Sequence, residues 1–205
     1  MKPMYQGQID VFCAAYAVVN AMRHLRAIRL LTCRELFHEA LLDLARDEHA
    51  FRDALNQETD YTRWVDSMLE RQKRLGGLQV QYPFPLDDTQ PAGMPQDPAF
   101  PPAQDISLEE LWATLGAWFA GGTRRAALFQ FVRYIFPNKT QIRHWTCCCS
   151  MEDTTLRLYD SSLDAGALHH LERDWLITDA HNAIIGNVLI VPYTVRLLRS
   201  RFEQI

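Results

Sequence analysis

The hydrophobic periodicity of the chain changes once along its length, and this change limits the folds that it can adopt. Up to about residue 120, apolar side chains recur at the three- and four-residue spacing of helices. Beyond that point, β-branched and aromatic residues gather in short runs between turn signals. Helices followed by strands predict an α+β fold, in which an N-terminal helical layer packs on a C-terminal antiparallel β-sheet.

Four helices are expected in the first part of the chain. They cover residues 13–28, a segment that begins after Thr32, residues 60–75 and a segment opened by Ser107. Thr32 with Glu35, and Ser107 with Glu110, have the spacing of a capping box, in which a hydroxyl and a carboxylate satisfy the first N–H groups of a helix. These pairs therefore predict where two of the helices begin.

Four strands are expected, over residues 126–136, 143–150, 154–159 and 184–195. Between the third and fourth helices, seven of the ten prolines fall between Pro83 and Pro102. A loop of this length without structure of its own is uncommon in a compact domain. We therefore expect residues 1–205 to form a single domain with an insertion or lid at about residues 83–105. A passive connector is the alternative.

The composition argues against several classes of function. A net charge of -4 provides no cationic surface for nucleic acid. No apolar run approaches the roughly 20 residues that span a bilayer, and the first residues lack the apolar region of a secretory signal. Five cysteines, three of them consecutive, do not suggest a disulfide framework. We expect a cytoplasmic protein without a membrane span, although export by a signal-less route would leave no trace.

The segment QIDVFCAAYAVVNA, residues 8–21, places Cys13 in the first turn of a predicted helix. The partial positive charge of a helix N-terminus stabilises a thiolate, which is the nucleophilic form of cysteine. An inert core thiol is the alternative, because free cysteine is among the most buried residue types. A nucleophilic role for Cys13 therefore requires a base and an orienting acid elsewhere in the chain.

His144 differs from the other six histidines because it opens a predicted strand. The segment that it opens reads as a hairpin with its turn at residues 151–153, and in that register His144 lies opposite Asp160. Directly opposed residues have Cβ atoms about 5 Å apart, so the carboxylate can reach the imidazole. A register shift of two residues keeps both side chains on one face, and a shift of one separates them. Asp160 is thus predicted to orient His144 as a general base for Cys13.

The order Gln8, Cys13, His144, Asp160 resembles that of the papain-like cysteine peptidase superfamily, whose cysteine begins a helix and whose histidine and acid lie on later strands. The separation of Cys13 and His144, 131 residues, also suits that architecture. The His-Trp…Asp hairpin is similar to that of bacterial members, including bacteriocin-leader peptidases. The resemblance implies that Gln8 and the backbone N–H of Cys13 form the oxyanion hole. Gln6 is the alternative donor.

Other residues compete for parts of this site. Asp164 and Asn182 are alternative third members, but both lie beyond the hairpin and need tertiary structure to reach His144. In a strand, Cys147 and Cys149 point to one face and Cys148 to the other, so the triple cysteine cannot supply three ligands to one metal ion. We expect these cysteines to pack in the interior.

The resemblance implies a cysteine hydrolase, foremost a peptidase that cleaves a protein or peptide through a thioester. An acyltransferase or transglutaminase-like enzyme would use the same Cys-His-Asp set. A papain-like binding module with weak chemistry is the third hypothesis, because fold does not guarantee function. Neither a metal nor an organic cofactor is required by any of the three. The substrate, the cleavage specificity and the oligomeric state are not fixed by the sequence.

Overall fold

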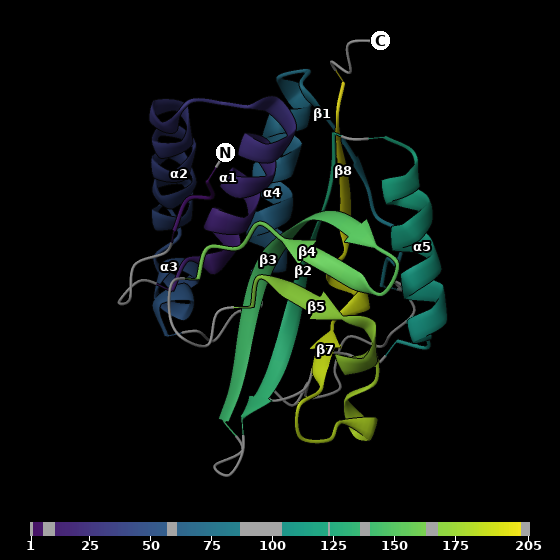
Figure 1. Cartoon of the computed structure of the whole chain (residues 1–205). Coiled ribbons are helices and arrows are strands. Elements are labelled where there is room, and N and C mark those ends of the chain that lie inside the picture. Colours follow the sequence, from purple (N-terminus) through teal and green to yellow (C-terminus); the bar gives the residue numbers. More distant parts are fainter. Residues whose placement is uncertain are drawn as a thin grey trace.

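The structure of the protein is a computed structural model, whose course from N-terminal helices to C-terminal strands is shown in Figure 1. It describes residues 2–5, 11–56, 61–86, 104–122, 124–135, 140–162 and 168–201. The helices of these residues are α1 (Cys13–Arg26), α2 (Leu30–Ala45), α3 (Glu48–Leu55), α4 (Thr62–Arg74) and α5 (Leu108–Ala120). The predicted α+β class is confirmed.

Two helix starts follow the sequence. α1 begins at Cys13, and α5 follows Ser107, whose Oγ accepts a hydrogen bond from the backbone N–H of Glu110 at 3.1 Å. α3 was not expected from the sequence. It is capped by Asp47, whose side chain accepts a hydrogen bond from the Ala50 N–H at 3.0 Å. Both caps satisfy N–H groups that lack a partner inside the helix.

The predicted start of the second helix is wrong. α2 begins at Leu30, two residues before Thr32, because the extended backbone of Arg29 (ψ 158°) already places it at the N-cap position. Thr32 therefore lies inside the first turn, and its spacing to Glu35 is not a capping box. α1 ends at Arg26, and the left-handed backbone of its C-cap, Ala27 (φ 51°), turns the chain towards Arg29, the N-cap of α2.

The strands form a mainly antiparallel sheet. They are β1 (Leu78–Gln81), β2 (Arg125–Ile135), β3 (Thr140–Glu152), β4 (Thr155–Leu158), β5 (His170–Glu172), β6 (Leu176–Ile177), β7 (Val188–Ile190) and β8 (Arg196–Ser200). The main path runs β1-β8-β2-β3-β4-β5, while β7 pairs with β2 and β6 pairs with β7. Of these pairings, β6–β7 is parallel and the others are antiparallel.

The predicted strand over residues 184–195 is wrong. Only Val188–Ile190 is extended there, as β7, and a 3-10 helix follows over Pro192–Thr194. Pro192 has a fixed φ and no N–H, so it cannot continue the ladder. Gly186 turns the chain just before β7 with a positive φ of 92°. Both residues interrupt what reads in the sequence as one apolar run.

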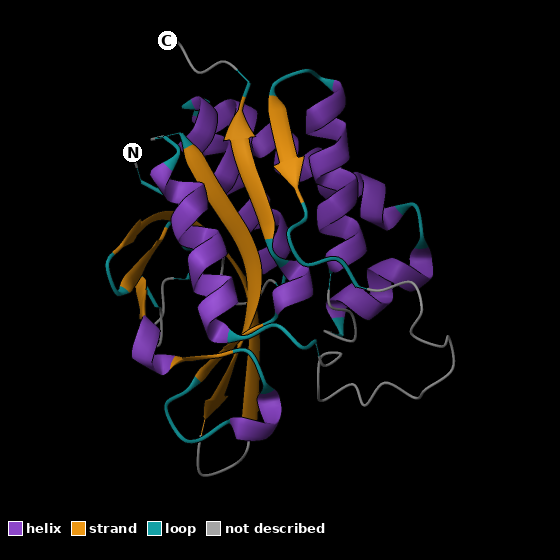
Figure 2. Ribbon diagram, turned by 90° about the vertical axis from the view of Figure 1, so that its right-hand side faces the viewer, coloured by secondary structure: helices purple, strands orange, loops and turns teal. Residues whose placement is uncertain are grey.

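Two apolar layers cover the two faces of β2 and β3, as Figures 1 and 2 show. α1 packs against the face that carries Leu128, Trp145 and Cys147. α5 packs on the other side, in a cluster that contains Phe131 and Cys148. This alternation follows the two-residue period of a strand. It fixes α1 beside β3, the strand that carries His144.

The proline-rich segment is only partly described. Gln104 Nε2 donates hydrogen bonds to the carbonyl oxygens of Phe84 and Pro85, at 3.4 Å and 3.2 Å, where the two described ends of this segment meet. The rest of the expected lid, residues 87–103, lies outside the described residues. Within the described part of the chain, no helix is both long and apolar enough to cross a membrane.

Candidate active site

Cys13 is the first residue of α1, and its side chain is buried. The preceding residue, Phe12, anchors this helix start in an aromatic cluster. Its ring centroid lies 6.5 Å from that of Phe37, 6.4 Å from that of Phe51 and 5.9 Å from that of Trp64. These aromatic contacts with α2, α3 and α4 hold Cys13 at the positive end of the α1 dipole.

His144 and Asp160 form a buried pair. Nε2 of His144 lies 3.0 Å from Oδ2 and 3.2 Å from Oδ1 of Asp160. The Asp160 carboxylate also accepts hydrogen bonds from the Thr146 hydroxyl and, at 2.8 Å, from the backbone N–H of Ser162. Because three donors surround the carboxylate, it stays ionised in the interior.

The Cys13 side chain lies beside the same imidazole, because its hydrogen bonding and charge are among the causes that raise the pKa of His144. Since Nε2 faces Asp160, Nδ1 is the ring nitrogen left for the thiol. The structure therefore brings Cys13, His144 and Asp160 together. Gln8 and the alternative donor Gln6 lie outside the described residues, so the structure describes no oxyanion donor side chain.

The electrostatics of the pair favour a charged imidazole. Burial lowers the pKa of His144, but the hydrogen bonds and charges of Asp160 and Cys13 outweigh this effect and raise the pKa to about 10. Burial raises the pKa of Asp160, but the hydrogen bond from His144 and its charge outweigh burial and lower it below its usual value. At neutral pH the site therefore holds an imidazolium beside a carboxylate.

The β3–β4 hairpin has a different register from the one expected. Glu152 pairs with Thr155, so the turn centre follows Glu152 instead of coinciding with it. A β-bulge between Cys148 and Ser150 then shifts the pairing, and Cys148 pairs with Leu158. The predicted direct opposition of His144 and Asp160 is therefore wrong.

The bulge determines which face Asp160 occupies. Continued without it, the turn register would align Asp160 with Cys147, on the face opposite His144. With it, Tyr159 donates its N–H to the Cys147 carbonyl at 2.7 Å, which aligns Asp160 with Thr146. Asp160 is then a diagonal neighbour of His144 on the same face, so their side chains still meet.

Sequence reasoning missed Thr146 and Ser162. Thr146 follows His144 by two residues, and the two-residue period of a strand could have placed it on the same face. Ser162 had no such signal, because it follows β4 in an irregular segment. Its Oγ lies 3.4 Å from Nε2 of His144. Of the alternative third members, Asp164 and the side chain of Asn182 lie outside the described residues.

The triple cysteine does not belong to this cluster of hydrogen bonds. Cys147 and Cys148 are fully buried and pack in different apolar clusters, one on each face of β3. Burial raises the pKa of both thiols. In the described ranges, no three His, Cys, Asp or Glu residues are grouped so that they could hold a metal ion.

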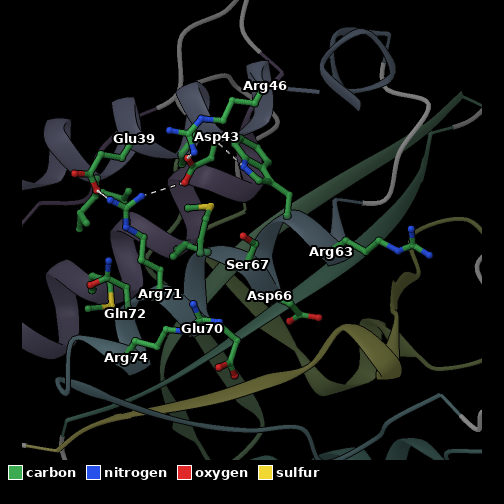
Figure 3. A pocket seen from close by; sticks show the side chains of 17 residues that line it. Glu39, Asp43, Arg46, Arg63, Asp66, Ser67, Glu70, Arg71, Gln72 and Arg74 are labelled. Carbon is green, nitrogen blue, oxygen red and sulfur yellow. Dashed lines mark hydrogen bonds and ion pairs between the residues drawn. The ribbon is translucent and has the colours of Figure 1, made fainter. Parts of the chain in front are cut away.

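A pocket of about 650 Å³ lies in the helical layer and is lined by residues of α1, α2 and α4. Figure 3 shows Arg71 between two carboxylates, and its ion pairs with Glu39 and Asp43 are both 3.0 Å long. Neither Cys13 nor His144 lines this pocket. It is therefore separate from the candidate active site.

Comparisons of the chain with protein-family models, with curated proteins and with solved structures find no match in any of the three. The class of protein is therefore defined by the fold and the site alone. It is an α+β protein with a buried Cys-His-Asp cluster between a helix start and a β-hairpin.

Proposed function

We propose that the protein is a cysteine peptidase of the papain-like type, acting on a protein or peptide. The observation that carries the proposal is the buried His144 imidazole, whose Nε2 lies 3.0 Å from the Asp160 carboxylate and whose pKa is raised by Asp160 and by the nearby Cys13. A nucleophile, a base and an orienting acid in mutual contact are what covalent acyl chemistry needs.

In this mechanism the proton of Cys13 resides on His144, and the thiolate attacks the carbonyl carbon of the scissile amide. The C–N bond then breaks, His144 gives its proton to the departing amine, and an acyl thioester remains on Cys13. Water, deprotonated by His144, then attacks the thioester, which releases the acid product and regenerates the Cys13 thiolate beside a protonated His144. The backbone N–H of Cys13 and the side chain of Gln8 stabilise the oxyanion in both halves of the reaction.

Asp160 supports the mechanism through His144. Its carboxylate holds Nε2, which leaves Nδ1 facing the nucleophile, and it stabilises the imidazolium that forms. Thr146 and the Ser162 N–H keep the carboxylate in place. The acid therefore does not need to accept a proton itself.

Alkylation of Cys13 by iodoacetamide tests the proposal. A thiolate held beside an imidazolium reacts near pH 6, where ordinary thiols are protonated, so Cys13 should be labelled at least about tenfold faster than a free thiol. His144→Ala should remove this advantage. His38→Ala is the matched control, because His38 is an exposed histidine of α2. A Cys13 that reacts no faster than a free thiol would contradict the proposal.

The fate of the thioester is tested by mass spectrometry of peptides incubated with the protein and an excess of a primary amine. Hydrolysis gives two fragments whose masses add up to the mass of the substrate plus one water. Transfer to the amine gives an adduct. This result would support an acyltransferase that uses the same residues in place of a peptidase. The Cys13→Ala variant should give neither product.

A further inference from the structure

A second pocket, of about 500 Å³, is lined by Arg133 of β2, Val188 of β7 and residues of the neighbouring loops. Figure 1 shows β7 beside β2 in the lower part of the sheet. The lining of the pocket is mainly apolar, with Leu168, Trp175, Ile184, Ile185 and Val188 among the lining residues. A volume of this size is typical of sites that hold a small ligand or a side chain with its flanking backbone. None of these residues takes part in the Cys-His-Asp cluster.

The register of β2 places this pocket beside His144. Phe131 pairs with His144, and the two rings are 5.4 Å apart between centroids. Arg133, which lines the pocket, follows Phe131 by two residues and is therefore a diagonal neighbour of His144 on the same face. Arg133 pairs in turn with Val188 of β7. As diagonal neighbours, Arg133 and His144 lie roughly 7–8 Å apart in the sheet, so the lining of the pocket includes a residue close to the proposed base.

The pocket presents apolar side chains to solvent in a fixed arrangement. Trp175 is 38% exposed, Ile184 69% and Ile185 68%. Asn187 fixes the turn that carries the isoleucines: its Oδ1 accepts from the Ile184 N–H at 2.9 Å, and its Nδ2 donates to the Trp175 carbonyl at 3.3 Å. Exposed apolar surface beside a reactive group is typical of a binding site.

We propose that this pocket is a subsite that binds an apolar side chain of the peptide whose amide Cys13 attacks. The inference rests on the proposed function. Among the lining residues, Arg133 and Asp174 carry one charge of each sign, so the pocket favours an uncharged side chain over a charged one. Arg133 of the pocket shares one face of β2 and β3 with His144, so a peptide that occupies the pocket can extend towards the imidazole.

The exposure of Trp175 gives a direct probe of binding. Of the five tryptophans, Trp175 is 38% exposed and each of the others is no more than 9% exposed. The protein is labelled with 5-fluorotryptophan in the Cys13→Ala background, so that no peptide is turned over. The ¹⁹F signal of Trp175, identified by its loss in Trp175→Phe, should shift with acetyl-Ala-Leu-Ala-amide and not with acetyl-Ala-Asp-Ala-amide.

Protection of Cys13 then tests whether the pocket belongs to the same site. In the wild-type protein, with initial labelling rates measured before the peptide is consumed, the leucine peptide at ten times its dissociation constant should slow iodoacetamide labelling of Cys13 roughly tenfold. Ile185→Asp should lose this protection, measured against its own rate without peptide. Leu42→Asp is the matched control, since Leu42 on α2 is 65% exposed and Ile185 is 68% exposed. It should keep the protection.

The outcomes separate this inference from the proposed function. Absence of a Trp175 shift, or a shift without protection of Cys13, would overturn the subsite while leaving a reactive Cys13 intact. A Cys13 that is slow to alkylate and insensitive to His144→Ala would instead overturn the proposed function, and with it the role of the pocket as a substrate subsite. Equal shifts with both peptides would overturn the stated selectivity.

Discussion

The molecule contains two clusters of charged residues that differ in burial. The pair of His144 and Asp160 has side chains that are 11% and 2% exposed. The cluster on α2 and α4, in which Arg71 bridges Glu39 and Asp43, has side chains that are 36–47% exposed. Ion-pair distances are 3.0 Å in both places. The two clusters therefore differ in burial and not in distance. Water screens the charges of the second cluster and not those of the first, so similar distances have different effects on stability.

The largest expected effect is at Asp160. Asp160→Ala leaves the His144 ring, the Thr146 hydroxyl and the Ser162 N–H without their shared acceptor in the interior. We expect a loss of about 3 kcal/mol in the free energy of unfolding. The rate of Cys13 alkylation at pH 6 should also fall by about a hundredfold. Denaturant titration and labelling kinetics measure the two effects.

Asp160→Asn keeps the shape of the side chain and serves as the companion variant. An amide accepts hydrogen bonds but carries no charge, so it should retain much of the stability and little of the charge stabilisation of His144. Equal unfolding free energies for wild type, Asp160→Ala and Asp160→Asn would contradict the structural role of the carboxylate.

The next effect in size is at Thr146. Thr146→Val removes one hydroxyl from a wholly buried position and should cost about 1–2 kcal/mol of unfolding free energy. It should also move the pH dependence of Cys13 alkylation, because Asp160 is held less firmly against His144. Thr146→Ser restores the hydroxyl, and its pH profile should return to that of the wild type. A Ser variant that behaves like Val would show that only packing matters at this position.

The dependence of stability on pH should follow the buried pair. The pKa of His144 is raised to about 10, so its contribution is complete below pH 6.5, the ordinary value, and is lost as the pH rises towards about 10. The pKa of Asp160 is lowered, so its contribution is present above its ordinary value and is lost in acid. Melting temperatures of His144→Gln and wild type should therefore differ most near pH 6 and converge towards pH 10. A constant difference would contradict the linkage.

The smallest expected effect is on the exposed cluster. Arg71→Ala removes two ion pairs, yet should change the unfolding free energy by less than about 1 kcal/mol. The difference should shrink further in 0.5 M salt, a condition in which the effect of Asp160→Ala persists. Denaturant titrations at two salt concentrations measure both. A salt-insensitive loss of several kcal/mol at Arg71 would remove the distinction between the two clusters.

The sequence predicted those features that depend on local periodicity. Residues that are close in the sequence predicted the helix start at Cys13 and the cap at Ser107. The shared face of His144 and Asp160 was also predicted, but the turn register alone would have separated the two side chains, and the bulge in β3 restores it. The contact of Cys13 with His144 could not be derived from periodicity, and the resemblance to papain-like peptidases supplied that expectation.

The sequence did not predict features that depend on long-range packing. The short strands β5, β6 and β8 are extended because they pair with neighbours, and their own residues give little signal. The bulge in β3 falls within the run of three cysteines, where no glycine marks it. The second helix begins earlier than predicted, because Thr32 and Glu35 have the spacing of a capping box but do not cap the helix.

The extra residue in β3 makes the hairpin respond differently to a residue lost from β3 and to one lost from β4. Deleting Cys149 would remove the bulge and join Cys148 directly to Ser150, whose partners Leu158 and Arg157 are already adjacent, so Asp160 would stay aligned with Thr146. Replacing Cys149 keeps the number of residues, and its side chain is only half-buried. A mutational library of this ribbon should therefore retain both replacements and the deletion of Cys149, whereas deletion of Arg157, which would align Asp160 with Cys147 on the face opposite His144, should be lost.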